Sequence, residues 1–430
     1  MAKASNKTYF AVLDIGSSKI VCLNIEIDCL GAAKVIGVGH QLAKGIGNDG
    51  VIADVKALEE SIISAVSMAE KAAGYDIENI LVNFSGNKLR SKYQEIEIDI
   101  SGGEVTDKDV ERINELAFDN YTNHDVEVVQ VVPINYAIDG INGISNPRYM
   151  CGKKLVAQLN LVALAQSALH NLLNCLARCH LNVSGILPSS YASALAVLSY
   201  EEMQNGVTVF DIGEGNTNLA IFHEGKMIYT ASFPFAGKLL TRDIQQIFSL
   251  SRSDAERVKA LYGSVFFDGT SNSRDTIDLF DMIRADESSS SQYIQKHKLS
   301  EIIYERSQEI FSYLHKFLQN DRDAKYAYQK AYGNIVLTGG GANLLGIAEL
   351  VKDIFGVRTR IAKPKEIAGM PDEHKDAQFS TIYGLVKHGV QQQKNLAGEF
   401  KDFSNKRLFL GKLKKFCYYP QVSDFLRKYF

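Results

Sequence analysis

The chain has 430 residues, of which 46% are hydrophobic and 23% are charged. This composition is typical of a globular protein with roughly two to three domains, whose core needs no disulfide or metal. A formal net charge of −3 excludes the overall basic character of many nucleic-acid-binding proteins, so we expect no nucleic acid partner. No signal peptide is expected, because the first ten residues lack a basic region followed by an apolar core. No spanning helix is expected, because the longest apolar run, residues 155–169, is shorter than the ~20 residues that a bilayer requires.

The first predicted elements alternate between strand and helix. Residues 9–25 are predicted to form an apolar strand, a tight polar turn and a second strand, with Asp14 and Gly16 in the turn. Apolar residues at helical spacing predict a helix over residues 55–73, and residues 80–84 are predicted to form another strand. This alternation indicates an α/β domain.

The pattern changes between about residue 86 and residue 162 to short strands around one helix, which indicates an inserted block. Thr106 is the expected N-cap of this helix, which is predicted to begin at Val110. After the block, helices are predicted over residues 166–179 and 188–198.

The second half begins with a repeat of the pattern that begins the first half. Residues 207–222 repeat the strand-turn-strand design of residues 9–25, with Asp211 and Gly213 in the turn. A unit that recurs at the start of each half predicts a duplicated domain.

The rest of the second half contains a third turn. Its predicted elements are, in chain order, a helix over 253–261, a polar loop over 274–291, a helix over 299–318, a strand over 335–337, a helix over 342–355 and a linker from 391. The third turn, Gly339, Gly340 and Gly341, separates the last predicted strand from its helix.

Each of the three turns has a composition suited to a nucleotide. Glycines let the backbone approach closely, and successive amide N–H groups can converge on phosphate oxygens. An aspartate beside them can hold Mg²⁺ through water, because this ion keeps most of its hydration shell. The third turn offers bare backbone to a flat adenine and ribose. The three turns, with the duplication, therefore predict an ATP site.

These turns resemble those of the sugar kinase, Hsp70 and actin superfamily, and within it the chain is similar to the FtsA family. The stretches that carry the resemblance to FtsA are residues 132–139, 146–147, 192–198, 253–259, 335–342, 381–385 and 425–430. The resemblance implies an actin-like ATPase fold with two duplicated ribonuclease-H-like domains, an inserted subdomain called 1C and a C-terminal amphipathic helix. It also implies ATP and Mg²⁺ as cofactors.

The resemblance assigns both the domains and the site residues. The expected divisions are subdomain 1A over residues 1–85 and 163–203, 1C over 86–162, 2A over 204–238 and 306–390, 2B over 239–305, a linker over 391–403 and a membrane-targeting tail over 404–430. The residues expected around the nucleotide are Asp14, Gly16, Ser17, Ser18, Lys19, Asp211, Gly213, Glu214, Gly215, Asn216, Thr217, Glu256, Lys259, Gly339, Gly340, Gly341 and Ala342. Asp14 and Asp211 are expected to hold Mg²⁺ through water.

The second turn departs from the family pattern Gly-Gly-Gly-Thr-x-Asp. Glu214, Asn216 and Asn218 replace its second glycine, its threonine and its aspartate. Nucleotide binding is expected to persist because the rest of the pattern remains. Hydrolysis is expected to be weak or absent, because Asn218 lacks the carboxylate of a general base. For Glu214 two roles are open, a place in the Mg²⁺ shell or a solvent-facing one.

Two pairs of charged residues have roles that only the resemblance implies. Glu256 and Lys259 are expected to reach the ribose and adenine, and the alternative is a solvated ion pair on a helix face. Glu301 and Arg306 match positions that in FtsA meet the acidic, apolar C-terminal tail of FtsZ. Two charges five residues apart are otherwise ordinary surface, but Arg306 suits a bidentate carboxylate partner.

The tail over residues 404–430 carries seven basic residues and one acidic residue. The residues expected to contact the membrane are Phe409, Leu413, Phe416, Val422, Phe425, Leu426, Arg427, Lys428, Tyr429 and Phe430. Their apolar members recur at helical spacing, and basic residues lie beside them. This pattern predicts a surface helix on anionic lipid, and the alternative is a helix that docks back on the body.

The resemblance thus implies a bacterial division protein that binds ATP, polymerises head to tail, binds the FtsZ tail and recruits later division proteins. It would anchor the Z ring to the cytoplasmic face of the inner membrane at the septum and would not be a metabolic enzyme. The alternatives are a sugar or acid kinase and an Hsp70-like ATPase. Tryptophan, common in sugar pockets, is absent, and about forty residues after the ATPase body are too few for a peptide-binding domain.

Overall fold

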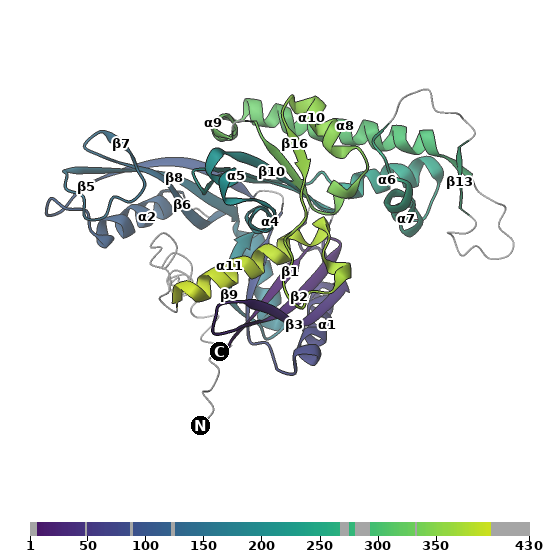
Figure 1. Ribbon diagram of the computed structural model, residues 1–430, viewed down its shortest axis with the longest axis horizontal. Coiled ribbons are helices and arrows are strands. Elements are labelled where there is room, and N and C mark those ends of the chain that lie inside the picture. Colours follow the sequence, from purple (N-terminus) through teal and green to yellow (C-terminus); the bar gives the residue numbers. More distant parts are fainter. Residues whose placement is uncertain are drawn as a thin grey trace.

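The computed structural model describes residues 7–47, 50–86, 89–121, 125–266, 275–279, 293–331 and 333–396, and the structural statements below refer to these residues. Two β-sheets lie on either side of a pair of helices, and further strands project from the body as an arm (Figure 1). The two sheets form the two halves of the molecule.

The two sheets have the same design. The first has the order β3-β2-β1-β4-β9, and the second repeats it as β12-β11-β10-β15-β16. In both, the first three strands are antiparallel and the last three are parallel. The strands are β1 (Thr8–Ile15), β2 (Lys19–Ile27), β3 (Ala33–Leu42), β4 (Asn79–Phe84), β9 (Asn182–Pro188), β10 (Val207–Ile212), β11 (Thr217–His223), β12 (Lys226–Phe233), β15 (Ile335–Thr338) and β16 (Thr359–Ile361). The predicted duplication is confirmed.

Helices cover the sheets and separate the halves. They are α1 (Val55–Ala73), α2 (Asp107–Tyr121), α3 (Gln166–Arg178), α4 (Ser189–Val197), α5 (Tyr200–Asn205), α6 (Gly237–Phe248), α7 (Arg252–Tyr262), α8 (Lys296–Asn320), α9 (Arg322–Lys330), α10 (Ile347–Phe355) and α11 (Ser380–Leu396). α4 contacts strands of both sheets, and α11 packs against α4 and β1. At their crossing a Cβ on Gly384 would lie 1.6 Å from the Ala192 carbonyl oxygen, so this contact requires glycine.

Local sequence explains why these elements form. β10 is buried along its whole length because a central strand is covered on both faces. α1 begins where the Asp54 side chain accepts a hydrogen bond from the Ala57 N–H, and it ends at Gly74, whose φ is 80°. An acceptor at the N-cap and a left-handed glycine at the C-cap are the usual end signals of a helix. The bounds predicted for α1 are confirmed.

The arm is the inserted block. Its strands, in the order β5-β8-β6-β7, are β5 (Arg90–Asp99), β6 (Val126–Ile138), β7 (Ile141–Ile144) and β8 (Lys154–Ala165). α2 packs on them over a separate apolar core. β5 extends the second sheet, with Arg90 paired to Ala231 of β12. In Figure 1 the arm points away from both halves.

Several boundaries differ from the sequence predictions. α2 begins at Asp107, because the Thr106 N–H and hydroxyl both donate to the Asp109 carboxylate. The third turn leads into a 3₁₀ turn over Gly340–Asn343. α10 therefore begins at Ile347 rather than at residue 342.

Two segments predicted to be irregular contain regular structure. Thr276–Asp278 (β13), inside the predicted loop, pairs with Tyr293–Gln295 (β14). α11 continues to Leu396, so the linker predicted from residue 391 is wrong over 391–396. Its glutamines and lysine are good helix formers and extend α11.

The predicted amphipathic tail, residues 404–430, lies outside the described residues. Among those that are described, no helix combines the length and apolar character needed to cross a membrane.

Candidate functional site

The first two turns have the same backbone geometry. In the turn after β1, the Gly16 N–H donates to the Lys19 carbonyl at 3.0 Å. In the turn after β10, the Gly213 N–H donates to the Asn216 carbonyl at 2.9 Å. The duplication therefore places Asp14 and Asp211 in equivalent positions, two residues before the glycine of each turn.

Asp14 is buried near the end of β1. The Asn83 side-chain amide, from the end of β4, donates to Asp14 Oδ1 at 2.7 Å. Burial raises the pKa of Asp14 and the negative charge of Asp211 raises it further, whereas the Lys19 ammonium and the Asn83 hydrogen bond lower it. The effect of the Asp211 charge on the pKa of Asp14 indicates that the two carboxylates lie near each other.

Asp211 is buried at the end of β10. The Thr381 hydroxyl, at the start of α11, lies 3.4 Å from its Oδ2. Burial raises the pKa of Asp211 to about 6, against the hydrogen bonds from Ser193, Thr381 and Asn218 and the charge of Lys19. Asn218 is its register partner on β11, and the buried Asn218 Oδ1 has no hydrogen-bond partner within the described part of the chain.

The residues of the two turns fit Mg²⁺ chemically. This ion prefers oxygen ligands and is usually held through one or two carboxylates and water. Asp14 and Asp211 supply two buried carboxylates that repel each other, a repulsion that a divalent cation would relieve. The pair therefore matches the metal role that the sequence predicted.

Lys19 and residues 377–379 link the first turn to the third. Lys19 Nζ donates to Gln378 Oε1 at 2.9 Å and lies 3.9 Å from the centre of the Phe379 ring. The Gly339 N–H donates to the Ala377 carbonyl at 3.2 Å. The first and third turns therefore meet at the 3₁₀ turn over Ala377–Phe379.

The glycines of the third turn have different roles. A Cβ on Gly339 would lie 2.4 Å from Asp211 Oδ1, and one on Gly341 would lie 2.3 Å from Ile212 Cγ2. These two glycines are required because the turn packs directly on the end of β10. Gly340 is exposed, and its Cβ would meet only the Gln378 Cβ, at 3.6 Å. Gly340 therefore offers open backbone.

The remaining predicted residues of the first two turns differ in exposure. Ser17 is half-buried and Ser18 is exposed, whereas Gly215, Asn216 and Thr217 are buried, as is Ala342 after the third turn. The Thr217 hydroxyl donates to the Phe235 carbonyl at 2.6 Å, so this hydroxyl is used within the protein. A Cβ on Gly50 would lie 2.0 Å from Asn216 Nδ2, which shows how closely the first half approaches the second turn.

Glu214 has a partner that neither of its expected roles included. Its carboxylate accepts a hydrogen bond from the Arg252 guanidinium, at the first residue of α7. The Lys238 N–H donates to the Glu214 carbonyl at 2.8 Å. The carboxylate is therefore paired within the second half.

Glu256 and Lys259 lie on α7 near the second turn and form an ion pair at 2.7 Å. Lys259 Nζ also donates to the Thr241 hydroxyl at 2.8 Å and to the Gly237 carbonyl at 3.2 Å. Gly237 in turn donates its N–H to the Gly213 carbonyl. The ion pair of the alternative interpretation is present, but the Lys259 side chain is only 12% exposed, so the pair is not a solvated one.

Arg306, on α8, is engaged by acidic neighbours. Its Nε and Nη2 donate to the two Asp243 carboxylate oxygens at 2.5 and 3.1 Å, which ties α8 to α6. Its Nη1 bonds Glu309. Glu301 accepts from Lys298 Nζ at 2.6 Å. The bidentate carboxylate partner expected for Arg306 is supplied by the chain itself.

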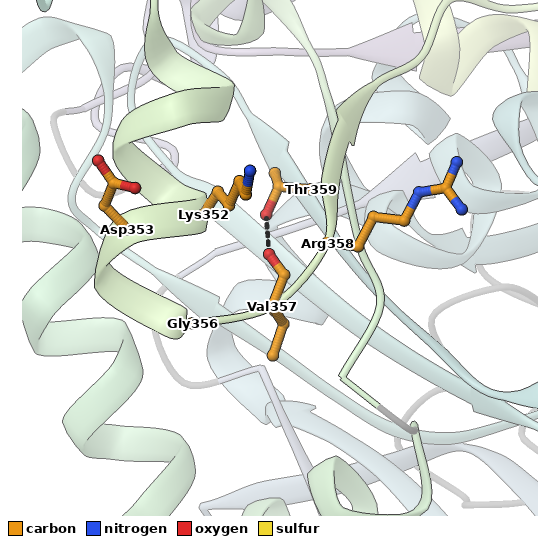
Figure 2. A pocket seen from close by; sticks show the side chains of 6 residues that line it. All are labelled: Lys352, Asp353, Gly356, Val357, Arg358 and Thr359. Carbon is orange, nitrogen blue, oxygen red and sulfur yellow. Dashed lines mark hydrogen bonds between the residues drawn. The ribbon is translucent and has the colours of Figure 1, made fainter.

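Two surface hollows lie on the second half, apart from the three turns. One, of 620 Å³, is bounded by Lys352, Asp353, Gly356, Val357, Arg358 and Thr359. Figure 2 shows the Arg358 side chain pointing away from Lys352, and the Thr359 hydroxyl donating to the Val357 carbonyl. The other, of 530 Å³, lies between α8 and α10. None of the predicted nucleotide-binding residues lines either hollow.

Four residues at the site were not predicted as site residues. They are Asn83, Ser193, Gln378 and Thr381. A polar residue near the end of an apolar strand was the available signal for Asn83. The others come from helical segments that only the tertiary structure brings to Asp211 or to Lys19.

Two family models match the chain. The model described as cell division protein FtsA matches residues 208–384. The model described as an SHS2 domain inserted in FtsA matches residues 86–163, which is the arm. The inserted domain expected from the sequence is thereby confirmed.

Curated relatives extend the similarity over most of the chain. Cell division protein FtsA of Agrobacterium fabrum is 32% identical, covering 92% of this chain and 91% of that protein. Cell division protein FtsA of Rhizobium meliloti is 33% identical, covering 87% and 86%. Cell division protein FtsA of Pseudomonas aeruginosa is 30% identical, covering 91% and 92%.

Solved structures confirm the actin-like fold. The PilM–PilN type IV pilus biogenesis complex matches with a TM-score of 0.62 at 19% identity, covering 89% of this chain and 98% of that one. MreB5 of Spiroplasma citri bound to ADP matches with a TM-score of 0.51 at 17% identity, covering 90% and 98%. At these identities the likeness concerns the fold.

Proposed function

The chain belongs to the FtsA family of cell division proteins, and on that premise we propose that it binds Mg-ATP between its halves and anchors a division ring to the membrane. The observation that carries the proposal is the pair of buried aspartates at equivalent turns of a duplicated fold. Burial of two carboxylates that repel each other is costly without a cation. MreB5 of Spiroplasma citri, which shares the fold, is described with ADP and with AMPPNP bound.

Asp14 and Asp211 would hold the metal through water, and the bound ion would neutralise phosphate charge. Other residues of the chain would bind the phosphates and the adenosine. The first two turns would bring Lys19 and backbone N–H groups to the phosphates, and the open backbone at Gly340 would receive the adenosine.

Replacing Gly340 with leucine is expected to block adenine and to abolish ATP binding in calorimetry. The Cβ at this position meets one atom at an ordinary contact distance, so the unfolding free energy should stay within about 0.5 kcal/mol of the parent value. Gly340→Ala is the matched control and should bind ATP like the parent. If Gly340→Leu binds ATP normally, the adenosine lies elsewhere.

Hydrolysis is proposed to be weak or absent, and the chain is not proposed to be a metabolic enzyme. Asn218 lies beside Asp211 and donates to it, so it supports the carboxylate rather than acting as a base. A sugar or acid kinase remains the alternative activity. Stoichiometric ADP formation that depends on one sugar would favour the kinase.

We also propose that the acidic, apolar C-terminal peptide of FtsZ docks on α8 near Glu301 and Arg306. The Arg306 side chain is 31% exposed and is shared between Asp243 and Glu309. Asp243 fixes the guanidinium, whereas Glu309 is itself 67% exposed and would compete with an acidic ligand for Nη1. Releasing Nη1 should therefore favour binding.

Two substitutions are expected to shift FtsZ peptide binding in opposite directions. Arg306→Glu should weaken it by roughly tenfold, because it reverses a charge that faces an acidic ligand. Glu309→Gln should strengthen it by a few-fold and leaves the Asp243 pair intact. Fluorescence anisotropy with a labelled peptide at low salt measures both. Equal dissociation constants for parent and variants would contradict this placement.

Head-to-tail polymerisation is proposed with the arm on one side of the contact, because such heterologous contacts build open filaments. Ile141 and Tyr149 on the arm are 70% and 76% exposed. Exposed apolar groups of this kind suit a protein contact.

The double variant Ile141→Lys, Tyr149→Lys is expected to abolish filaments on lipid in electron microscopy while ATP binding persists. Surface substitutions are preferable to deleting residues 86–162, because deletion would uncover the β12 edge that β5 pairs with. Tyr200→Lys on α5, where Tyr200 is 72% exposed, is the control. Unchanged filaments in the double variant would remove the arm from the contact.

The tail over residues 404–430 is proposed to bind anionic lipid on the cytoplasmic face of the inner membrane at the septum. The proposal rests on its basic charge and its apolar spacing. A chain so anchored would recruit later division proteins to the Z ring.

A further inference from the structure

The first two turns of α4 carry three buried serines. Ser189 is 3% exposed, and Ser190 and Ser193 are fully buried. A buried hydroxyl costs free energy unless it is hydrogen-bonded. The partners of these three hydroxyls therefore show what this part of the helix does.

Ser189 is linked to Asp14 through Asn83. The Ser189 hydroxyl donates to the Phe84 carbonyl at 3.0 Å and accepts from Asn83 Nδ2 at 3.0 Å. The same Asn83 amide donates to Asp14 Oδ1 at 2.7 Å, while Asn83 Oδ1 accepts the Ile15 N–H at 2.8 Å. The Asn83 side chain is thus held on three sides, and Ser189 fixes the side that faces away from Asp14.

Ser193 lies one turn further along α4, and a hydrogen bond from its side chain lowers the pKa of Asp211. Its hydroxyl is also placed to donate to the Ser190 carbonyl, at 3.2 Å. The single hydroxyl hydrogen is better used by the carboxylate, because hydrogen bonds to charged acceptors are stronger. Positions 189 and 193 are four residues apart and share one face of the helix.

Ser190 offers a contrast within the same helix. Its hydroxyl is paired with Thr230 Oγ1 of β12 at 2.6 Å, so its hydrogen bond runs to a strand rather than to either aspartate. It is as deeply buried as Ser193. The loss of its hydroxyl would therefore report on packing alone.

We propose that α4 is a shared positioning element of the nucleotide site, in which Ser193 directly and Ser189 through Asn83 orient the two carboxylates that would hold Mg²⁺. α4 contacts strands of both sheets and is drawn between the halves in Figure 1. One helix thus sets the relative position of the two turns. This inference rests on the proposed Mg-ATP site, and Ser189, Ser193 and Asn83 act in it as positioning residues.

The test compares alanine variants of the full-length protein. ATP binding is measured by calorimetry with Mg²⁺ and with EDTA. Ser193→Ala is expected to lose about tenfold in Mg²⁺-dependent affinity, the usual effect of one hydrogen bond to a charged group. Ser189→Ala should lose less, because it acts through Asn83, and Ser190→Ala should match the parent. Affinity in EDTA should be the same in all four proteins.

A double-mutant cycle separates positioning from packing. In the Asn83→Ala background, Ser189→Ala should have no further effect on Mg²⁺-dependent affinity, whereas Ser193→Ala should keep its full effect. Melting temperatures show whether each variant folds, and Ser190→Ala sets the effect of losing one buried hydroxyl.

Two results would overturn the inference. One is parent-like Mg²⁺-dependent affinity in Ser193→Ala and Ser189→Ala. The other is a loss in Ser190→Ala as large as that in Ser193→Ala, which would assign the serines to packing. If the parent chain itself shows no Mg²⁺-dependent ATP binding, the proposed function fails and the inference falls with it, and the parent measurement alone identifies that case.

Discussion

Replacing Asp211 with asparagine is expected to lower the Mg²⁺-dependent affinity for ATP by about 10- to 100-fold, the usual effect of losing a group that orients a metal's ligands. Calorimetry with and without EDTA measures the change. The melting temperature, in contrast to the affinity, should not fall. Burial raises the pKa of Asp211 to about 6, so its charged form is disfavoured in the folded chain, and at pH 8 the neutral variant should melt no lower than the parent.

Asp139→Asn is the matched control for this change. Asp139 lies in the arm, its carboxylate accepts the N–H groups of Lys153 and Lys154, and its φ of 48° is one that asparagine tolerates. It should bind Mg-ATP like the parent. A parent-like affinity in Asp211→Asn would remove this carboxylate from the metal site, and a large fall in its melting temperature would mean that the charge supports the fold.

Truncation after Gly398 is expected to release the protein from anionic vesicles and to leave ATP binding intact. Each basic residue near an anionic surface contributes roughly 1 kcal/mol to membrane binding. The deleted segment contains the basic and apolar residues that are predicted to contact the membrane. Flotation with vesicles that contain anionic lipid measures the loss. Binding of the full chain should also weaken with added salt, because salt screens these charges.

A pair of glutamate substitutions tests the apolar face itself. Leu426→Glu places a charge on the face predicted to enter the lipid and should release the full chain. Ser423→Glu adds the same charge off that face and should have a smaller effect. If the truncated chain still floats with the vesicles, the anchor lies elsewhere in the protein.

Sequence alone predicted the parts of the fold that local signals encode. The turns with Asp14 and Asp211 were found from an apolar strand, a glycine and a second strand, a pattern confined to a few residues. Repetition of that pattern predicted the duplication, which the equal strand order of the two sheets confirms. α1 was predicted with its observed bounds from apolar residues at helical spacing, and Asp54 and Gly74 cap its ends in the structure. The arm was predicted as an insertion because its pattern of short strands around one helix differs from the pattern of the flanking sequence.

Local sequence signals misplaced those element boundaries that depend on tertiary contacts. The start of α10 was misplaced because Gly339 and Gly341 pack against the end of β10, a contact that sequence spacing does not reveal. The linker predicted from residue 391 was wrong over 391–396 because polar composition alone does not separate a linker from an exposed helix.

The tertiary structure decided which side chains surround the two aspartates. Asn83, Ser193 and Thr381 reach them from β4, α4 and α11, segments far apart in the chain, and no short pattern links them. It also paired Glu214 with Arg252 and Arg306 with Asp243. The residue type in the sequence specifies the sign of each charge. Which partner it meets depends on how the elements pack, because ion pairs and hydrogen bonds act over a few ångströms of space rather than along the chain.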